Sequence, residues 1–421
     1  MKFSLKFNEI YQLLLFAVLI VALNWCFTST DTNFTPRSIA QNNYPVEEHI
    51  VPTTDGYLLS IYRIPAATKA NTTPPKKTSE VVLLQHGFTL SSDVWLLRGP
   101  KNDLPYLLAE AGYDVWLGNH RGNEYGRKHI SLDPKRDRQH FWNFTWHEMG
   151  YYDLANTIDY MREATGQKSV HYVGYSQGGL VALVLLTTRP EYAEKFKSMQ
   201  FTAPTVYMEN IKVPLPTAWI SGLGNYFSRF LEWWGHSETL QHARWNFHKQ
   251  MCSVLCDDGA WLRPIYLKIF SMFGGPVDAS ENYEHILTKM CGNVPVGASS
   301  KQVLHYVQQY VTGGFNQFDY GTVDSNIRQY GQPSPPSYNV SSVRNCISLY
   351  YSETDYMCAA EDVRRLGRDL QCAELNRMPY TAWNHGDFVW SRYARKALHE
   401  PIIARISSWS EAAGDRAEVK N

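Results

Sequence analysis

The stretch that decides the fold is SVHYVGYSQGGLVA, residues 169–182. Residues 170–173 are short, apolar and rich in β-branched side chains, which predicts a buried strand. Residues 180–186 are strong helix formers. The turn between them has the pattern G-x-S-x-G, which holds a Ser on a sharp strand-to-helix turn at the edge of a sheet. The flanking strand and helix favour this interpretation over an incidental Ser in a Gly-rich turn.

Ser176 is therefore the candidate nucleophile, and we expect a strained backbone at this residue. Gly174 and Gly178 flank it because a Cβ at either position would collide with the neighbouring strand or helix. The first N–H groups of the following helix are expected to face any anion that forms beside Ser176. A Gly-His-Ser at residues 235–237 lacks the second Gly of the pattern.

A second turn is expected to complete an oxyanion hole. Residues 81–85 form a continuous apolar run, as in the buried centre of a parallel sheet, and end in His86-Gly87-Phe88. Hydrolases with a nucleophile elbow place one oxyanion donor after the nucleophile and the other on a turn of this kind. We therefore assign the backbone N–H groups of Phe88 and Gln177 to the oxyanion hole, and give His86 a structural role in its loop.

The order of the remaining candidates along the chain fits the same architecture. Residues 346–351 predict an apolar strand with Asp355 on the loop after it, and His385 lies in a turn about thirty residues later. The order Ser176, Asp355, His385 is the one this architecture uses. A Ser hydroxyl is a weak nucleophile, so it needs His385 as general base. Asp355 fixes the tautomer of that imidazole and stabilises its cation.

Rival residues are disfavoured by their position in the chain. Asp387 is two residues from His385 and is expected to brace the loop, while Asp319 and Asp324 belong to a segment with a different pattern. Several rival histidines precede Ser176, which is the wrong side for this chain order; they include His86, His120, His129, His140 and His147.

The pattern of the chain predicts a core with one insertion. Strand and helix patterns alternate over residues 44–206 and again over 337–410, whereas aromatic residues recur at helical spacing over 207–336. We predict an α/β-hydrolase fold, with a mostly parallel central sheet, helices on both faces and a helical cap or lid at 207–336. An apolar cap facing a nucleophile predicts an apolar substrate. A plain helical core is the alternative interpretation of the aromatic residues.

The composition bounds the partners and cofactors. Lys and Arg number 40, as do Asp and Glu, so nothing in the net charge suggests a nucleic acid. The mechanism needs only the triad and two backbone N–H groups, so we expect no cofactor and no metal.

The N-terminus predicts the secretory pathway. Lys2 and Lys6 precede an apolar run at 13–23, which is typical of a signal peptide. We place it at residues 1–30, with the cut between 24 and 35. An uncleaved anchor is the alternative, although a spanning helix needs ~20 apolar residues. Four N-glycosylation sequons follow: Asn33, Asn71, Asn143 and Asn339.

Removing Cys26 with the signal peptide leaves six cysteines, an even number that permits disulfides in an oxidising compartment. Cys252 and Cys256 have a metal-like spacing, but no second pair or His cluster completes a zinc site. We expect a disulfide within or near residues 252–291, with its pairing left open.

Taken together, these motifs resemble the acid lipase family, which includes gastric and lysosomal acid lipases and their insect relatives. The resemblance covers residues 44–405 and rests on LQHG at 84–87, GNHRGN at 118–123, FW at 141–142, HEMG at 147–150, residues 174–178, FDYG at 318–321, NH at 384–385 and DF at 387–388. It implies an α/β-hydrolase with a cap and lid that hydrolyses acylglycerols or cholesteryl esters. It also matches Ser176, Asp355 and His385 to the triad, and Phe88 and Gln177 to the oxyanion hole.

Two departures from the family pattern are Tyr175, where His is common, and Gly386, where Leu is common. Neither removes a catalytic group. The sequence thus predicts a secreted or lysosomal lipase acting on neutral lipids at a lipid–water interface through an acyl-enzyme, and it leaves the oligomeric state open. The alternatives are a carboxylesterase for shorter esters and a non-catalytic lipid-binding protein on a lipase scaffold. The complete triad disfavours the second of these.

Overall fold

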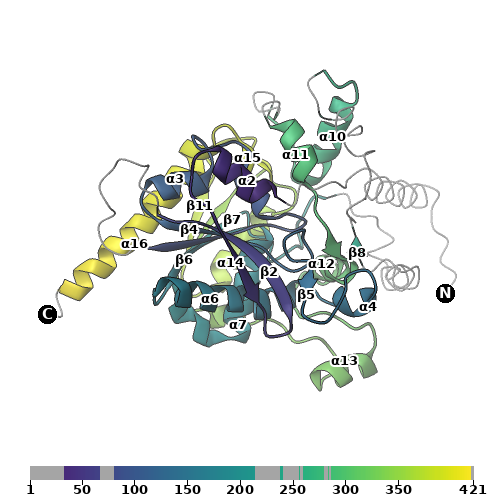
Figure 1. Cartoon of the computed structure of the whole chain (residues 1–421). Coiled ribbons are helices and arrows are strands. Elements are labelled where there is room, and N and C mark those ends of the chain that lie inside the picture. The colour runs from purple at the N-terminus through teal and green to yellow at the C-terminus, as the bar shows by residue number, and fades with distance from the viewer. Residues whose placement is uncertain are drawn as a thin grey trace.

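The computed structural model describes residues 33–66, 80–213, 238–239, 256, 259–278, 283 and 286–418, with side chains through residue 410 (Figure 1). The predicted signal peptide at 1–30, the sequon at Asn71 and Cys252 lie outside these residues. Over the described ranges, no helix combines the length and the apolar content that a bilayer-spanning segment requires.

One mixed sheet of nine strands organises the described chain (Figure 1). Its order is β1-β2-β4-β3-β6-β7-β10-β11, and β5 pairs with β2. From β4 to β11 the neighbouring strands are parallel, whereas β2 is antiparallel to β1, β4 and β5. The strands are β1 (Glu47–Pro52), β2 (Tyr57–Ile64), β3 (Val81–Gln85), β4 (Asp114–Gly118), β5 (Lys128–His129), β6 (Val170–Tyr175), β7 (Phe196–Thr202), β10 (Ile347–Tyr351) and β11 (Ala373–Arg377).

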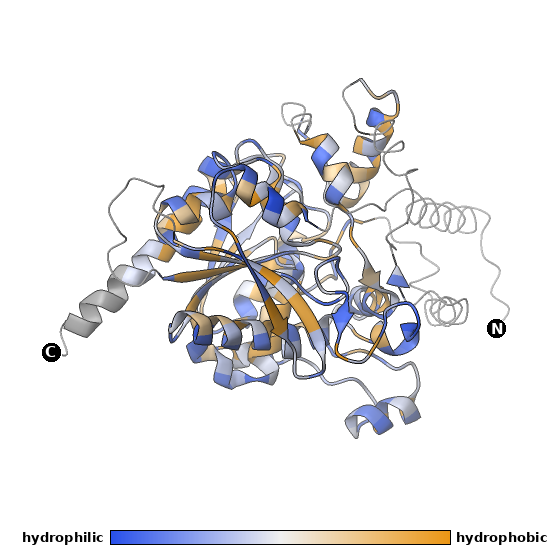
Figure 2. Cartoon of the chain, viewed as in Figure 1, coloured by the Kyte–Doolittle hydropathy of each residue, from blue (hydrophilic) through white to orange (hydrophobic). Residues whose placement is uncertain are grey.

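The central strands are buried on both faces because helices cover both sides of the sheet. Every residue of β3, β4 and β6 is buried, as the continuous apolar runs predict. Figure 1 shows α6 and α7 on one side of the sheet and α3 and α16 on the other. Figure 2 shows the central strands mostly in the hydrophobic colours. This arrangement confirms the predicted α/β-hydrolase core.

The helices that surround the sheet, including 3-10 and π turns, are α2 (Phe34–Gln41), η1 (Ser92–Leu96), α3 (Leu104–Glu110), α4 (Arg138–Phe141), α5 (Trp146–Glu148), η2 (Met149–Leu154), α6 (Ala155–Thr165), α7 (Gln177–Thr188), η3 (Pro190–Lys195), η5 (Val340–Ser342), α14 (Ala360–Asp369), α15 (Asp387–Trp390), η6 (Arg395–His399) and α16 (Glu400–Glu418). The apolar spacing over residues 147–164 predicts one helix, but a π turn at η2 interrupts it. Gly150 in this turn lies against α7, where a Cβ would come within 2.6 Å of the Val181 carbonyl oxygen. The backbone at Gly150 therefore packs closely on α7 where the π turn occurs. Apolar spacing alone does not predict this turn.

The chain leaves the sheet after β7 and returns at β10. The described part of this inserted segment is mainly helical, with α10 (Arg263–Gly274), α11 (Leu287–Asn293), α12 (Ser300–Thr312) and α13 (Val323–Tyr330). Its two short strands, β8 (Glu238–Thr239) and β9 (Ala298–Ser299), pair with each other and not with the central sheet.

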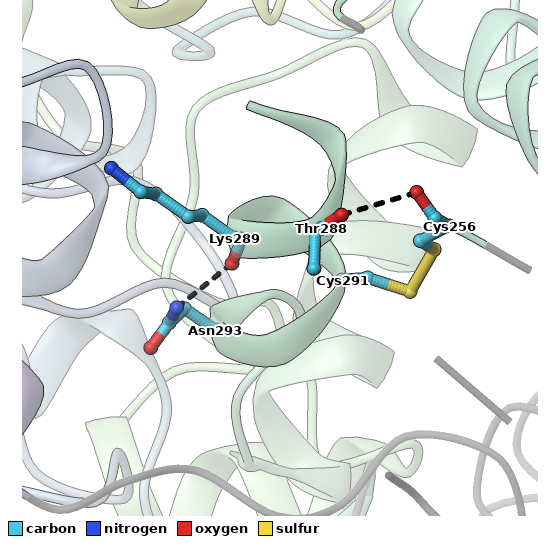
Figure 3. Close-up of a disulfide and its surroundings, with 5 residues drawn as sticks. All are labelled: Cys256, Thr288, Lys289, Cys291 and Asn293. Atoms are coloured by element: carbon cyan, nitrogen blue, oxygen red, sulfur yellow. Dashed lines mark hydrogen bonds between the residues drawn. A yellow bond between two sulfur atoms is a disulfide. The ribbon is translucent and has the colours of Figure 1, made fainter. Parts of the chain in front are cut away.

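Two disulfides are present in the described chain. Cys256 bonds to Cys291 on α11, where Thr288 also donates a hydrogen bond to the carbonyl oxygen of Cys256 at 3.3 Å (Figure 3). This confirms the expected bridge in the 252–291 region. The second bridge joins Cys346, before β10, to Cys372, before β11. Cys358 is reduced and buried.

Candidate active site

Ser176 lies on the sharp turn between β6 and α7, as the G-x-S-x-G pattern predicts. Its φ is +54° and its ψ is −114°, a conformation that an L-residue adopts only when the surrounding structure enforces it. The Ser176 N–H donates to the carbonyl oxygen of Thr202 on β7 at 2.9 Å, which ties the turn to the neighbouring strand. The expected backbone strain at Ser176 is confirmed.

The two flanking glycines are required by close backbone approach. A Cβ on Gly174 would lie 2.7 Å from the carbonyl carbon of Gly178. A Cβ on Gly178 would lie 2.5 Å from the carbonyl oxygen of Gln85 on β3. Both obstacles are main-chain atoms, so the collisions predicted from the sequence are confirmed.

Replacing Gly178 with Ala is expected to lower the free energy of unfolding by about 1–3 kcal/mol, because either β3 or α7 must shift to admit the methyl group. Urea titration measures this change. Gly292→Ala in α11 is the matched control, because its added Cβ meets nothing within 4 Å. For this control the free energy of unfolding is expected to rise by about 0.4–1 kcal/mol. Equal stability of the Gly178 variant and the wild type would contradict the collision argument.

The loops after β6, β10 and β11 bring three side chains together. His385 Nε2 lies 2.9 Å from Ser176 Oγ, and His385 Nδ1 lies 2.8 Å from Asp355 Oδ2. Asp355 Oδ1 accepts hydrogen bonds from the backbone N–H groups of Met357 at 2.8 Å and Cys358 at 2.9 Å. The carboxylate is buried and satisfied on both oxygens, so it holds the imidazole with Nδ1 as donor and Nε2 facing the hydroxyl.

The loop that carries His385 is fixed by contacts from three other parts of the chain. Tyr175 OH donates to the carbonyl oxygen of His385 at 2.8 Å, and the His385 N–H donates to the carbonyl oxygen of Gly274 at the end of α10, at 2.9 Å. Asp387 accepts from the Asn384 N–H at 2.6 Å and from Tyr283 OH at 2.5 Å. Asp387 thus braces the loop, as expected.

Sequence reasoning missed the roles of Tyr175 and Gly274. Tyr175 is visible in the sequence only as a departure from a family pattern. Nothing in the spacing of residues links either position to His385.

The turn after β3, at His86-Gly87-Phe88, lies directly against Ser176. A Cβ on Gly87 would come within 3.0 Å of Ser176 Cβ. His86 Nδ1 donates to the Gly87 carbonyl oxygen at 2.8 Å, and its Nε2 accepts from the His120 N–H at 3.3 Å. Burial lowers the pKa of His86 to about 3, so the ring is neutral and serves the loop as a structural group. Phe88 follows on this loop, and Gln177 is the first residue of α7.

Ser176 opens into a cavity of about 170 Å³. Its walls come from the β3 loop, from residues 205–213 after β7, from the end of α10, from α12 and from the loop after β10. Apart from three residues that carry a hydroxyl, the lining is apolar: Phe88, Ser176, Thr205, Met208, Ile211, Val213, Phe273, Val303, Tyr306, Val307 and Met357. Such a lining can bind a hydrocarbon group beside Ser176.

Two buried acids, Asp93 and Glu124, lie on the segments that follow β3 and β4. Asp93 on η1 accepts hydrogen bonds on Oδ1 from Thr35 Oγ1 at 2.5 Å and from Tyr125 OH at 2.7 Å. Burial raises the pKa of Asp93 to about 6, and burial together with the charge of Asp93 raises the pKa of Glu124 well above its usual value. Two buried carboxyl groups that interact in this way favour a shared proton, because ionising both would place two like charges together away from water.

The acid pair is expected to make the fold more stable at acidic than at neutral pH. Each folded-state pKa lies above the usual value, so the stabilisation is complete below about pH 4 and falls as the pH rises, with the contribution of Asp93 lost through about pH 6. Glu124→Gln should reduce the fall in unfolding free energy between pH 4.5 and 7.5 by about 1–3 kcal/mol. Urea titrations at both pH values test this, with the exposed Glu163→Gln as control. An unchanged pH dependence in the Glu124 variant would argue against a shared proton.

Three of the four predicted sequons are described, and Asn33, Asn143 and Asn339 are all exposed. Asn143 Oδ1 accepts a hydrogen bond from Lys301 Nζ at 2.9 Å, so attachment of a glycan there would alter this contact.

Comparisons with known proteins agree with the geometry. Residues 80–236 match the family model described as alpha/beta hydrolase fold, and residues 35–99 match the model described as partial alpha/beta-hydrolase lipase region. The chain is 37% identical to Lipase 3 of Drosophila melanogaster, over 88% of this chain and 92% of that protein. It is 33% identical to gastric triacylglycerol lipase of Bos taurus, over 88% of this chain and 90% of that protein.

Solved structures show the same fold at much lower sequence identity. A soluble variant of monoglyceride lipase from Saccharomyces cerevisiae aligns with a TM-score of 0.50 and 14% identity, over 87% of this chain and 96% of that one. The identity to Lipase 3 and to gastric triacylglycerol lipase over nearly whole chains is decisive. The chain therefore belongs to the acid lipase family of α/β-hydrolases.

Proposed function

We propose that this protein is a lipase that hydrolyses ester bonds of neutral lipids, triacylglycerols or cholesteryl esters, through an acyl-enzyme on Ser176. One observation carries the proposal. His385 lies within hydrogen-bond distance of both Ser176 Oγ and Asp355 Oδ2, and Ser176 lines an apolar cavity. The printed names of the relatives, which include a gastric triacylglycerol lipase, support the lipid substrate.

The reaction uses the groups already described. His385 Nε2 takes the proton of Ser176 Oγ as that oxygen attacks the ester carbonyl carbon. The carbonyl oxygen becomes an oxyanion, which the N–H groups of Phe88 and Gln177 stabilise by hydrogen bonds. Collapse of the intermediate expels the alcohol, which takes the proton from His385. Water then attacks the acyl-enzyme with His385 as base, releasing the fatty acid and restoring Ser176, while Asp355 stabilises the imidazolium in both halves.

The apolar lining supports the proposal that the cavity binds the acyl chain of the substrate. Six of its side chains are aliphatic or thioether groups, drawn from residues 205–213, from α12 and from the loop after β10. The described residues of the segment 207–336 contribute much of this wall, which supports a role for that segment as a cap over Ser176. No cofactor enters the mechanism, since the ester carbonyl is activated by backbone N–H groups alone.

The protein is directed to the secretory pathway, as a secreted or lysosomal enzyme. The signal-like residues 1–30 support this location, and so do the two disulfides, because disulfides persist in oxidising compartments. Asn33, Asn71, Asn143 and Asn339 are the acceptor sites for N-glycans.

Labelling with a fluorophosphonate probe, followed by mass spectrometry of the adduct, tests the nucleophile. Modification is expected on Ser176. A panel of triolein, cholesteryl oleate and short soluble esters then separates a lipase from a carboxylesterase by the dependence of rate on acyl length and on emulsification. A folded protein that takes no label at Ser176, with or without a lipid interface, would instead be a non-catalytic lipid-binding protein.

A further inference from the structure

Helix α12 of the inserted segment contacts both residues to which the oxyanion hole is assigned. Gln177 Oε1 accepts hydrogen bonds from Tyr306 OH at 2.7 Å and from Gln302 Nε2 at 2.6 Å. The ring of Tyr306 also packs against Phe88, with the ring centroids 4.8 Å apart. Gln302 and Tyr306 are four residues apart and so share one face of the helix. That face is turned toward the oxyanion residues.

The Gln177 amide is held from more than one direction. Its side chain is buried, and its Nε2 lies 3.4 Å from Met149 Sδ on η2. When a buried amide loses a hydrogen-bond partner, the folded protein is destabilised and the amide tends to move. The two donors on α12 therefore fix the position of the Gln177 side chain.

The backbone N–H groups of Gln177 and Phe88 depend on side-chain contacts to fix their direction. The N–H of Gln177 is one of the first four of α7, which have no partner inside the helix, and it follows the strained Ser176. Phe88 lies on an irregular loop, followed by Thr89 with a φ of +52°. Neither N–H direction is set by a strand ladder or a helical hydrogen bond. Side-chain anchors are therefore a main constraint on where the two N–H groups point.

We propose that Tyr306 and Gln302 are positioning residues for the oxyanion hole. They act through the Gln177 side chain and, for Tyr306, through the Phe88 ring. The inference rests on the proposed function, since an oxyanion hole has a role only if Ser176 forms an acyl-enzyme. It gives the inserted segment a part in transition-state stabilisation in addition to covering the site.

Tyr306→Phe tests this directly, because it removes the hydroxyl and keeps the ring on Phe88. For a soluble p-nitrophenyl ester, kcat should fall about tenfold with KM nearly unchanged. The loss is smaller than the ~10²–10³ for a deleted oxyanion donor, because the donor is displaced and not removed. Affinity for an alkyl boronic acid, which mimics the tetrahedral intermediate, should fall by the same factor, while inhibition by free fatty acid should not change.

Tyr310→Phe is the matched control, since it makes the same change one turn along α12, and its kinetics should equal those of the wild type. Gln302→Met provides a second variant that does not touch Phe88, and it should also lower kcat with little effect on KM. If the Tyr306 variant does not fold, the Gln302 variant still tests the proposal.

A double-mutant cycle identifies the route of the effect. In a Gln177→Ala background, which keeps the backbone N–H but lacks the anchored amide, Gln302→Met should cause no further loss of kcat. An additive loss in that background, or unchanged kcat in both single variants, would overturn the proposal. Failure of the proposed function itself would look different, because Ser176→Ala would then retain ester hydrolysis.

Discussion

Replacing Ser176 with Ala is expected to reduce kcat for ester hydrolysis by about 10⁵–10⁶-fold, because the oxygen that forms the acyl-enzyme is lost. The backbone should keep its conformation, since Ala meets the same steric limits as Ser at a φ of +54°. The melting temperature should therefore stay within a few degrees of the wild type. Initial rates on emulsified triolein and on a soluble ester, together with a thermal melt, give both quantities.

The matched control for this variant is Ser408→Ala, a surface hydroxyl in α16 that bonds the carbonyl oxygen of Arg405. Its activity should equal that of the wild type. A folded Ser176 variant with more than a few per cent of wild-type activity would show that the nucleophile lies elsewhere.

Replacing Asp355 with Asn is expected to lower kcat by about 10⁴-fold. Two backbone N–H groups, those of Met357 and Cys358, point at Oδ1. The Asn oxygen should take this position, which turns its NH₂ group toward His385 Nδ1. The imidazole must then carry its proton on Nε2, so it cannot accept the proton of Ser176 Oγ.

Asp387→Asn separates the triad acid from the acid that braces the loop. Asp387 contacts Asn384 and Tyr283, so its replacement should disturb the loop and cost less than about tenfold in kcat. Comparing kcat, KM and the melting temperature of the two variants distinguishes the roles. If the Asp387 variant lost as much activity as the Asp355 variant, the assignment of the triad acid would be wrong.

The sequence by itself determined the core of the fold and predicted which three side chains, those of Ser176, Asp355 and His385, meet at its edge. Apolar runs such as residues 81–85 and 170–173 identify buried parallel strands, because only a strand covered on both faces is apolar at every position. The G-x-S-x-G motif is local, so the strained Ser176 and the collisions at Gly174 and Gly178 could be deduced from neighbours in the chain. The order Ser176, Asp355, His385 follows from the order of the strands.

Only the tertiary structure decided which polar groups meet across long separations. The hydroxyl of Tyr175 reaches the backbone of a residue 210 positions away, and Tyr306 reaches Gln177 across 129 positions. The pairing of Cys256 with Cys291 was equally open, since six cysteines allow fifteen connectivities. Periodicity records which face of an element is apolar. It does not record which side chain on another element lies within 3 Å, because that distance depends on how the elements pack.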